Sequence, residues 1–196
     1  MLTRTNDKRL ENYMTFTTIQ EAALKRFGEQ GFHGTSLSQI AADVGIKPPS
    51  IYAHFESKEE LFLSLVEPTI EKELAYAREF FKTPLTNETL FDFLKDIGRR
   101  FEKAPMRRFL LHLAYLPPQP LIVQTDKPVK RYMNSLDRLM LQTFRQLPAG
   151  RLTLEEMASS YIGIVDSLQA EILYGGKRRF QKRLSALWAL FRLALS

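Results

Sequence analysis

The chain has 196 residues, 44% of them hydrophobic and 26% charged, a balance typical of a globular protein and not of a disordered one. It contains no cysteine, which excludes disulfides and thiolate metal sites. The formal net charge is +6, which favours a polyanionic partner, but residues 1–60 hold seven Lys and Arg against eight Asp and Glu. The positive charge therefore lies in the later part of the chain.

Membrane insertion is not expected, because no apolar run approaches the ~20 residues that span a bilayer. The apolar run "ALWALFRLAL" is short and contains Arg192, and the polar start "MLTRTNDKRLENYM" lacks the apolar centre of a signal peptide. We expect a cytoplasmic protein.

Helical spacing appears almost throughout the chain, whereas alternating strand patterns are nearly absent. The first apolar stripe ends at Gly31 and comprises Phe16, Ile19, Ala23 and Phe27. The second begins after Thr35 or Ser36, ends at Gly45 and comprises Leu37, Ile40, Ala41 and Val44. A very short third helix has Ile51 and Phe55 as its inward pair. The segment "SKEE" is a capping box with Ser57 as N-cap and Glu60 reaching back.

The later helices are expected at 58–81 with Pro68 inside, at 87–103 and at 105–116. The segment "LPPQPLIVQTDKP" predicts a loop, followed by a helix from Pro128 to about Leu147. A capping box at 153–156 opens a helix through Tyr174, and the last helix covers 178–195. The sequence thus predicts an all-α fold of about nine helices.

The second and third helices are joined by the tight turn "VGIK", which is the layout of a helix-turn-helix. Pro48 and Pro49 fall at the first helical positions, where a missing N–H costs little. With Ile51 and Phe55 facing the core, the outward side chains are Ser50, Tyr52, Ala53 and His54. Together with Lys47, they include donors suited to phosphates and base edges.

The segment "TSLSQIAADVGIKPPSIYAHFESKEEL" is similar to the N-terminal signature of the TetR family of bacterial transcriptional repressors. The resemblance extends back through "IQEAALKRFGEQGFHG" and covers about residues 15–65. It implies a helix-turn-helix domain over 1–57 and a ligand-binding and dimerisation bundle over 58–196. Further, it implies a two-fold homodimer that binds double-stranded operator DNA and releases it when a small-molecule effector binds.

By position, the resemblance assigns phosphate contacts to Thr35, Tyr52, His54 and Lys58. It places Lys47, Pro48, Pro49, Ser50 and Ala53 at the start and on the exposed face of the DNA-reading helix. Many members have Ser at position 47, Lys at 48 and Gly or Ala at 49. Here the Lys precedes the helix and prolines follow, so we expect DNA shape to supply part of the sequence specificity.

The later helices are rich in aromatic residues, which could form core packing or line an apolar effector cavity. Candidate ligand contacts are Phe109, His112, Tyr115, Tyr132, Tyr161 and Asp166. His112 could equally be a core histidine, and Asp166, Gln169 and Glu171 could be pocket groups or interface hydrogen bonders. The cluster "KRRFQKR" at 177–183 could be a solvated helix start or favour an anionic effector.

The last two long helices are apolar over more than one stripe, which predicts a two-fold dimer closed by a four-helix bundle. Its predicted interface residues are Tyr161, Leu168, Ile172, Leu184, Leu187, Trp188 and Phe191.

Catalytic, metal and cofactor sites are not predicted, since no nucleophile elbow, Gly-rich phosphate loop or metal-ligand spacing occurs. Two other functions stay open. One is a helical small-molecule carrier or enzyme with a vestigial DNA-binding head, and the other is an architectural or activating DNA-binding protein without an effector.

Overall fold

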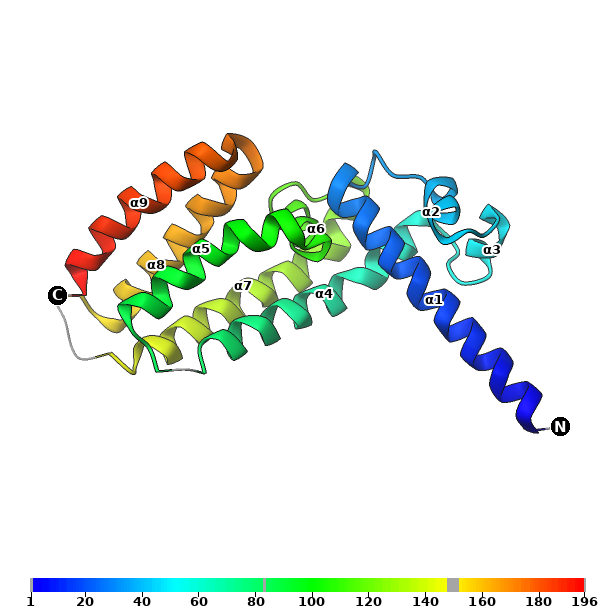
Figure 1. Cartoon of the computed structure of the whole chain (residues 1–196), viewed down its shortest axis with the longest axis horizontal. Coiled ribbons are helices and arrows are strands. Elements are labelled where there is room, and N and C mark those ends of the chain that lie inside the picture. Colours follow the sequence, from blue (N-terminus) through cyan, green and yellow to red (C-terminus); the bar gives the residue numbers. More distant parts are fainter. Residues whose placement is uncertain (1, 83, 148–151, 196) are drawn as a thin grey trace. The chain divides into compact units, whose positions relative to one another are not determined.

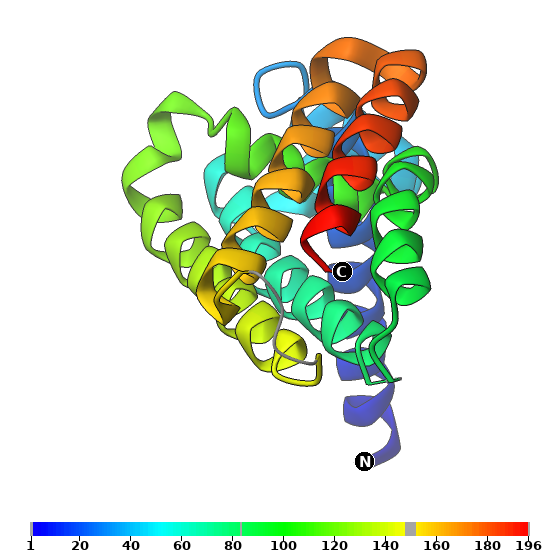
Figure 2. The same cartoon turned by 90° about the vertical axis from the view of Figure 1, so that its left-hand side faces the viewer.

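The computed structural model describes residues 2–82, 84–147 and 152–195, and within these ranges all regular secondary structure is helical (Figures 1 and 2). This confirms the all-α fold class. The chain forms two compact units, which we call unit 1 (residues 1–69 and 105–128) and unit 2 (residues 70–104 and 129–196). The predicted helix-turn-helix domain, residues 1–57, falls entirely within unit 1.

Unit 1 contains four whole helices, a 3₁₀ turn (Gln119–Leu121) and the first parts of two further helices. The whole helices are α1 (Leu2–Gln30), α2 (Leu37–Val44), α3 (Pro48–Tyr52) and α6 (Pro105–Tyr115), and the divided ones are α4 (Lys58–Phe80) and α7 (Ile122–Phe144). The predicted inward stripe of α1 is confirmed, since Ile19, Ala23 and Phe27 are at most 1% exposed. Helix α6 packs closely on α1, where a Cβ added to Gly28 would lie 2.6 Å from the carbonyl oxygen of Pro105. Only glycine allows this approach without a shift of backbone.

Local signals set the ends of α2 as the sequence predicts. Ser36 is its N-cap and forms a capping box with Gln39, so Ser36 and not Thr35 begins the helix. Gly45 ends the helix in a left-handed conformation, with a φ of 75°. In this conformation the Gly45 N–H donates to carbonyl oxygens of the last helical turn.

Unit 2 is a bundle of the remaining helical segments. They are the second part of α4, α5 (Asn87–Lys103), most of α7 (Ile122–Phe144), α8 (Leu154–Ala170), a π-helical turn (Glu171–Gly175) and α9 (Gly176–Ala194). The predicted capping box of Thr153 and Glu156 opens α8. The core of unit 2 includes Leu90, Leu94, Phe144 and Phe180, each at most 4% exposed. Gly98 of α5 lets the Phe180 ring of α9 approach to 2.9 Å from where a Cβ would be.

A buried charged network links α4 and α5 within unit 2. Glu73 accepts two hydrogen bonds from Arg100, at 2.9 and 2.6 Å, and the guanidinium lies 3.5 Å above the Tyr76 ring. The Tyr76 hydroxyl donates to Asp96, and burial together with this bond raises the pKa of Tyr76. The bidentate geometry compensates two charges that would be costly to bury alone.

The proline-rich loop expected over 116–128 is shorter than predicted. A 3₁₀ turn (Gln119–Leu121) leads directly into α7, which begins at Ile122 and contains Pro128 in its interior. Leu121 and Thr125 are buried one turn apart, and the Thr125 hydroxyl donates to the Leu121 carbonyl at 2.9 Å. Burial of this first turn favours helix despite the N–H that Pro128 lacks.

The predicted dimer interface is corrected by the packing of unit 2. Tyr161, Leu168, Leu184 and Phe191 are at most 5% exposed within the single chain, so they form its core. The other three predicted residues, which are half-buried against the same core, are Ile172, Leu187 and Trp188. The broad apolar faces of α8 and α9 are covered by α5 and by each other, which periodicity alone does not reveal.

Candidate DNA-binding surface and ligand groove

The short helix α3 presents the face that the sequence assigns to DNA. Pro48 and Pro49 occupy its first two positions, and Lys47 is the N-cap residue. Ile51 and Phe55 are 0% and 2% exposed and fix the helix to unit 1, where Phe55 stacks on Phe16 at 4.9 Å. Burial of each of these side chains stabilises the attachment by about 1.5–3 kcal/mol.

The outward residues of α3 are accessible as predicted. Tyr52 is 59% exposed, and the side chains of Lys47, Pro48, Pro49, Ser50 and Ala53 are also exposed. His54 is half-buried, with its ring 6.2 Å from the Phe16 ring. This small, rigid surface carries a phenol, a hydroxyl and an ammonium group, which are donors suited to phosphate oxygens.

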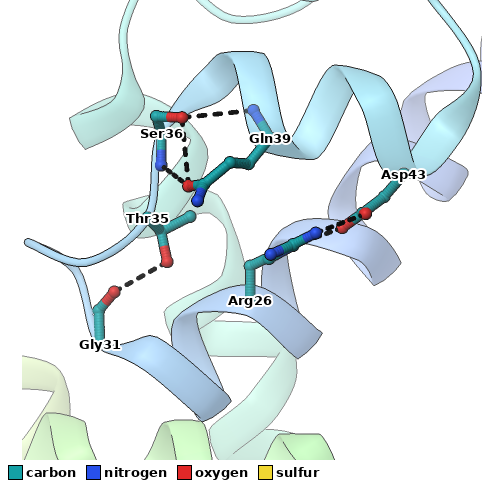
Figure 3. A network of polar contacts seen from close by, with 6 residues as sticks. All are labelled: Arg26, Gly31, Thr35, Ser36, Gln39 and Asp43. Carbon is teal, nitrogen blue, oxygen red and sulfur yellow. Dashed lines mark hydrogen bonds and ion pairs between the residues drawn. The ribbon is translucent and has the colours of Figure 1, made fainter.

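An ion pair holds α2 on α1 next to this surface. The guanidinium of Arg26 donates to both carboxylate oxygens of Asp43, at 2.6 and 2.7 Å (Figure 3). The hydrogen bond from Arg26 lowers the pKa of Asp43. The two helices of the helix-turn-helix are therefore anchored separately, α2 by this ion pair and α3 by its buried residues.

Thr35 is placed differently from the predicted phosphate contact. Its side chain is 2% exposed, and its hydroxyl donates to the carbonyl oxygen of Gly31 at 2.9 Å (Figure 3). The side chain thus closes the turn between α1 and α2, and the burial favours this structural role over a surface contact. Ser36, the neighbouring N-cap, is the exposed hydroxyl of this turn.

Lys58, also assigned to phosphate, already has protein partners. Its Nζ donates to the carbonyl oxygens of Phe32 at 2.9 Å and Thr35 at 3.0 Å, and lies 4.2 Å from the centre of the Phe32 ring. The first residue of α4 is thereby joined to the α1–α2 turn. These contacts give Lys58 a structural role, which is to hold the start of α4 against the α1–α2 turn.

A groove of about 680 Å³ lies within unit 1, between the end of α1, α6 and the segment after α6. Three predicted ligand residues line it, Phe109, His112 and Tyr115. The sequence reasoning missed His33 of the α1–α2 turn and Leu116 to Pro118, because turns and proline-rich segments were expected only to connect helices.

The other predicted ligand residues belong to unit 2. Tyr132 and Tyr161 are 6% and 0% exposed, and Asp166 is half-buried. The Tyr161 hydroxyl donates to the Leu90 carbonyl at 2.7 Å, and burial raises its pKa well above the ordinary value. Tyr161 is therefore a hydrogen-bonded core residue and not a cavity wall.

The basic cluster at 177–183 is partly neutralised within unit 2. Arg179 and Arg183 donate to the carboxylate of Glu171 at 2.8 and 2.6 Å, and these bonds lower the pKa of Glu171. Lys177 lies 3.6 Å from a carboxylate oxygen of Glu102. These ion pairs favour a structural role for the cluster over binding of an anionic effector.

Comparison with known proteins places these features in a family. Residues 19–65 match the family described as "Bacterial regulatory proteins, tetR family". This N-terminal segment therefore matches the TetR family. The match spans the end of α1, the helix-turn-helix and the start of α4, which are the elements that build the surface described above.

Individual relatives share mainly this N-terminal part. UidR of Escherichia coli K12, an HTH-type transcriptional regulator, is 40% identical over 65 residues, 33% of this chain and 33% of its own length. IcaR of Staphylococcus epidermidis, a negative transcriptional regulator of the biofilm operon icaADBC, is 32% identical over 89 residues, 43% of this chain and 48% of its own length. The chain thus matches a third to a half of the length of these relatives, both of which are transcriptional regulators.

Similarity of the fold extends over nearly the whole chain. FadR of Bacillus subtilis, solved in complex with stearoyl-CoA, superposes with a TM-score of 0.62 at 19% identity, over 90% of this chain and 97% of that one. Among the described residues, no three His, Cys, Asp or Glu side chains are arranged to hold a metal ion. Within the same residues, the helices are too short or too polar to cross a membrane.

Proposed function

We propose that this protein is a transcriptional repressor that binds operator DNA as a two-fold dimer in the cytoplasm and releases it on binding a small molecule. The observation that carries the proposal is the exposed outer face of α3, with Tyr52 at 59% exposure, on a helix whose inner residues are fully buried. A rigid, exposed helix face of this kind suits insertion into the major groove of DNA. A carrier with a vestigial head would not require it.

Repression and effector release are supported by the relatives. IcaR is a negative regulator, and FadR of Bacillus subtilis was solved with a small-molecule ligand. In this proposal the effector binds more tightly to the conformation that fits DNA poorly, and this difference in affinity drives release.

The dimer is proposed to form through the outward faces of α8 and α9, which lie side by side in unit 2 (Figure 2). On α9, Leu190 and Leu193 are 66% and 65% exposed. Two neighbouring leucines exposed to water in this way are unusual in a soluble monomer. On α8, Ser160 and Gly163 are exposed, and a Cβ added to Gly163 would meet no atom within 4 Å. Small residues on α8 beside leucines on α9 would let two such pairs pack as a four-helix bundle.

The test is titration of the purified protein into DNA from upstream of its own gene and into random duplex. Specific binding with a steep salt dependence is expected, with half-sites about one DNA turn, roughly 34–36 Å, apart. Ala53→Glu puts a negative charge on the exposed face of α3 and should abolish binding. Gln142→Glu makes the same charge change on an exposed position of α7 and should leave binding unchanged. Equal affinity for random and upstream DNA would contradict the proposal.

A further inference from the structure

The outermost part of α3 is apolar. Ile51 and Phe55 bury the inner side of the helix, and the Phe55 N–H donates to the Ile51 carbonyl at 3.0 Å, so the helical turn continues to Phe55. At about 100° per residue, Pro49 and Ala53 each lie about 200° from Ile51 around the helix axis, which places both on the opposite side. Both are exposed, and we call this pair the outer edge of α3.

The first turn of α3 has no free main-chain donor to offer a base. Pro48 and Pro49 have no N–H, and the N–H of Ser50 donates to the Lys47 carbonyl at 2.9 Å. A base edge in front of this turn therefore meets only side chains.

Side chains with hydrogen-bonding groups lie beside the outer edge and not on it. Ser50 and Tyr52 lie about 100° to either side of Ile51, and Lys47 precedes the helix as its N-cap residue. Their hydroxyl and ammonium groups suit phosphate oxygens. The segment "KPPSIYA" at 47–53 contains no Arg, Asn, Gln, Asp or Glu. It therefore lacks the guanidinium that reads guanine, the amide that reads adenine and the carboxylate that reads cytosine.

Thymine is the base that matches an apolar outer edge. Every base presents donors or acceptors in the major groove, and thymine alone adds a C5-methyl group. A donor or acceptor buried against Pro49 or Ala53 would lose its water without gaining a partner, whereas a thymine methyl buried there gains hydrophobic contact. Proline and alanine also lose almost no side-chain entropy in such a contact.

We propose that Pro49 and Ala53 read thymine methyl groups, so that each operator half-site presents at least one thymine to the outer edge of α3. The proposal rests on the function proposed above and names the feature of the DNA that these two residues recognise.

The test starts from duplexes that the full-length protein selects from a random pool. Each thymine of the selected half-site is then replaced by deoxyuridine, which removes only the methyl group and keeps the base pair. At least one replacement per half-site should weaken binding roughly fourfold, the effect of one buried methyl group, and the same replacement in both halves roughly fifteenfold. Deoxyuridine in the flanking sequence outside the selected site is the control and should leave Kd unchanged.

Two substitutions locate the methyl contact on the protein. Pro49→Ala and Ala53→Gly should each reduce the ratio of affinities for the thymine and deoxyuridine duplexes, and the double variant should bring it close to one. The ratio separates contact from folding, since a loss of stability weakens binding to both duplexes alike. Tyr52→Phe is the matched control, because it removes a hydroxyl beside the outer edge and keeps the ring. It should weaken binding to both duplexes and leave the ratio unchanged.

Equal affinity for the thymine and deoxyuridine forms at every selected position would overturn this proposal and leave the proposed function standing. A ratio that persists in the double variant would also overturn it, because the methyl group would then act through another residue or through DNA shape. Absence of any preference over random duplex would refute the proposed function itself.

Discussion

Replacing Lys58 with Met separates two roles for this residue, contact with DNA phosphate and support of the α1–α2 turn. The substitution keeps most of the aliphatic stem but removes the ammonium group that donates to the Phe32 and Thr35 carbonyls at 2.9 and 3.0 Å. It also removes the cation 4.2 Å from the Phe32 ring.

The cost follows from these contacts. A hydrogen bond to a charged group contributes roughly 1.5–3 kcal/mol to stability, but Lys58 is half-buried and water can reach part of the site after substitution. We therefore expect the two bonds together to contribute about 2 kcal/mol. For a chain of this size, that loss lowers Tm by about 4–8 °C.

The assay pairs thermal unfolding, followed by circular dichroism, with operator binding at several salt concentrations. Lys47→Met is the matched control, because Lys47 is exposed and its side chain makes no capping hydrogen bond. It should leave Tm unchanged and reduce the salt slope by about 1.8 per dimer, at about 0.9 for each lost phosphate contact. An unchanged Tm for Lys58→Met, together with the same loss of slope, would refute the structural role.

Three further substitutions test other parts of the structure. Gly163→Leu should break the dimer in light scattering, whereas Gly163→Ala should keep it and raise helix stability by up to about 1 kcal/mol; a dimer that survives Gly163→Leu contradicts the α8–α9 interface. Glu171→Gln should flatten the decline in stability on acidification: the Glu171 pKa is lowered in the folded state, so its contribution is present above the unfolded value of 4.5 and is lost as pH falls through the folded value. Urea midpoints for both proteins between pH 6 and pH 3 check this, and parallel declines would contradict it. Gly28→Ala should destabilise by about 1–3 kcal/mol in urea unfolding, because its Cβ would lie 2.6 Å from the Pro105 carbonyl oxygen, and an unchanged midpoint would show that α6 shifts freely.

The sequence predicted the helix-turn-helix segment, α2 and α3, in detail because the signals that define this segment are local. The double proline fixes the start of α3, Gly45 ends α2, and the spacing of Ile51 and Phe55 decides which face of α3 is exposed. Each of these depends on backbone conformation within a few residues, so a single sequence suffices to read it.

Residues whose roles depend on distant partners were not predictable in the same way. Tyr161 and Leu168 have the apolar character of interface residues, yet they lie in the core of unit 2. Lys58 has the position of a phosphate ligand, yet its ammonium group donates to carbonyls 23 and 26 residues earlier in the chain. Periodicity reports that a helix face is apolar but not which neighbour covers it.

The sequence by itself determined the all-α class, the helix caps and the exposed face of α3, since capping, proline geometry and short-range spacing act within one or two turns. Only the tertiary structure decided which apolar helix faces are buried in the chain's own core, and that Leu116, His33 and His112 line one groove. The physical reason is that packing and cavities are properties of segments far apart in sequence, whose approach no local pattern encodes.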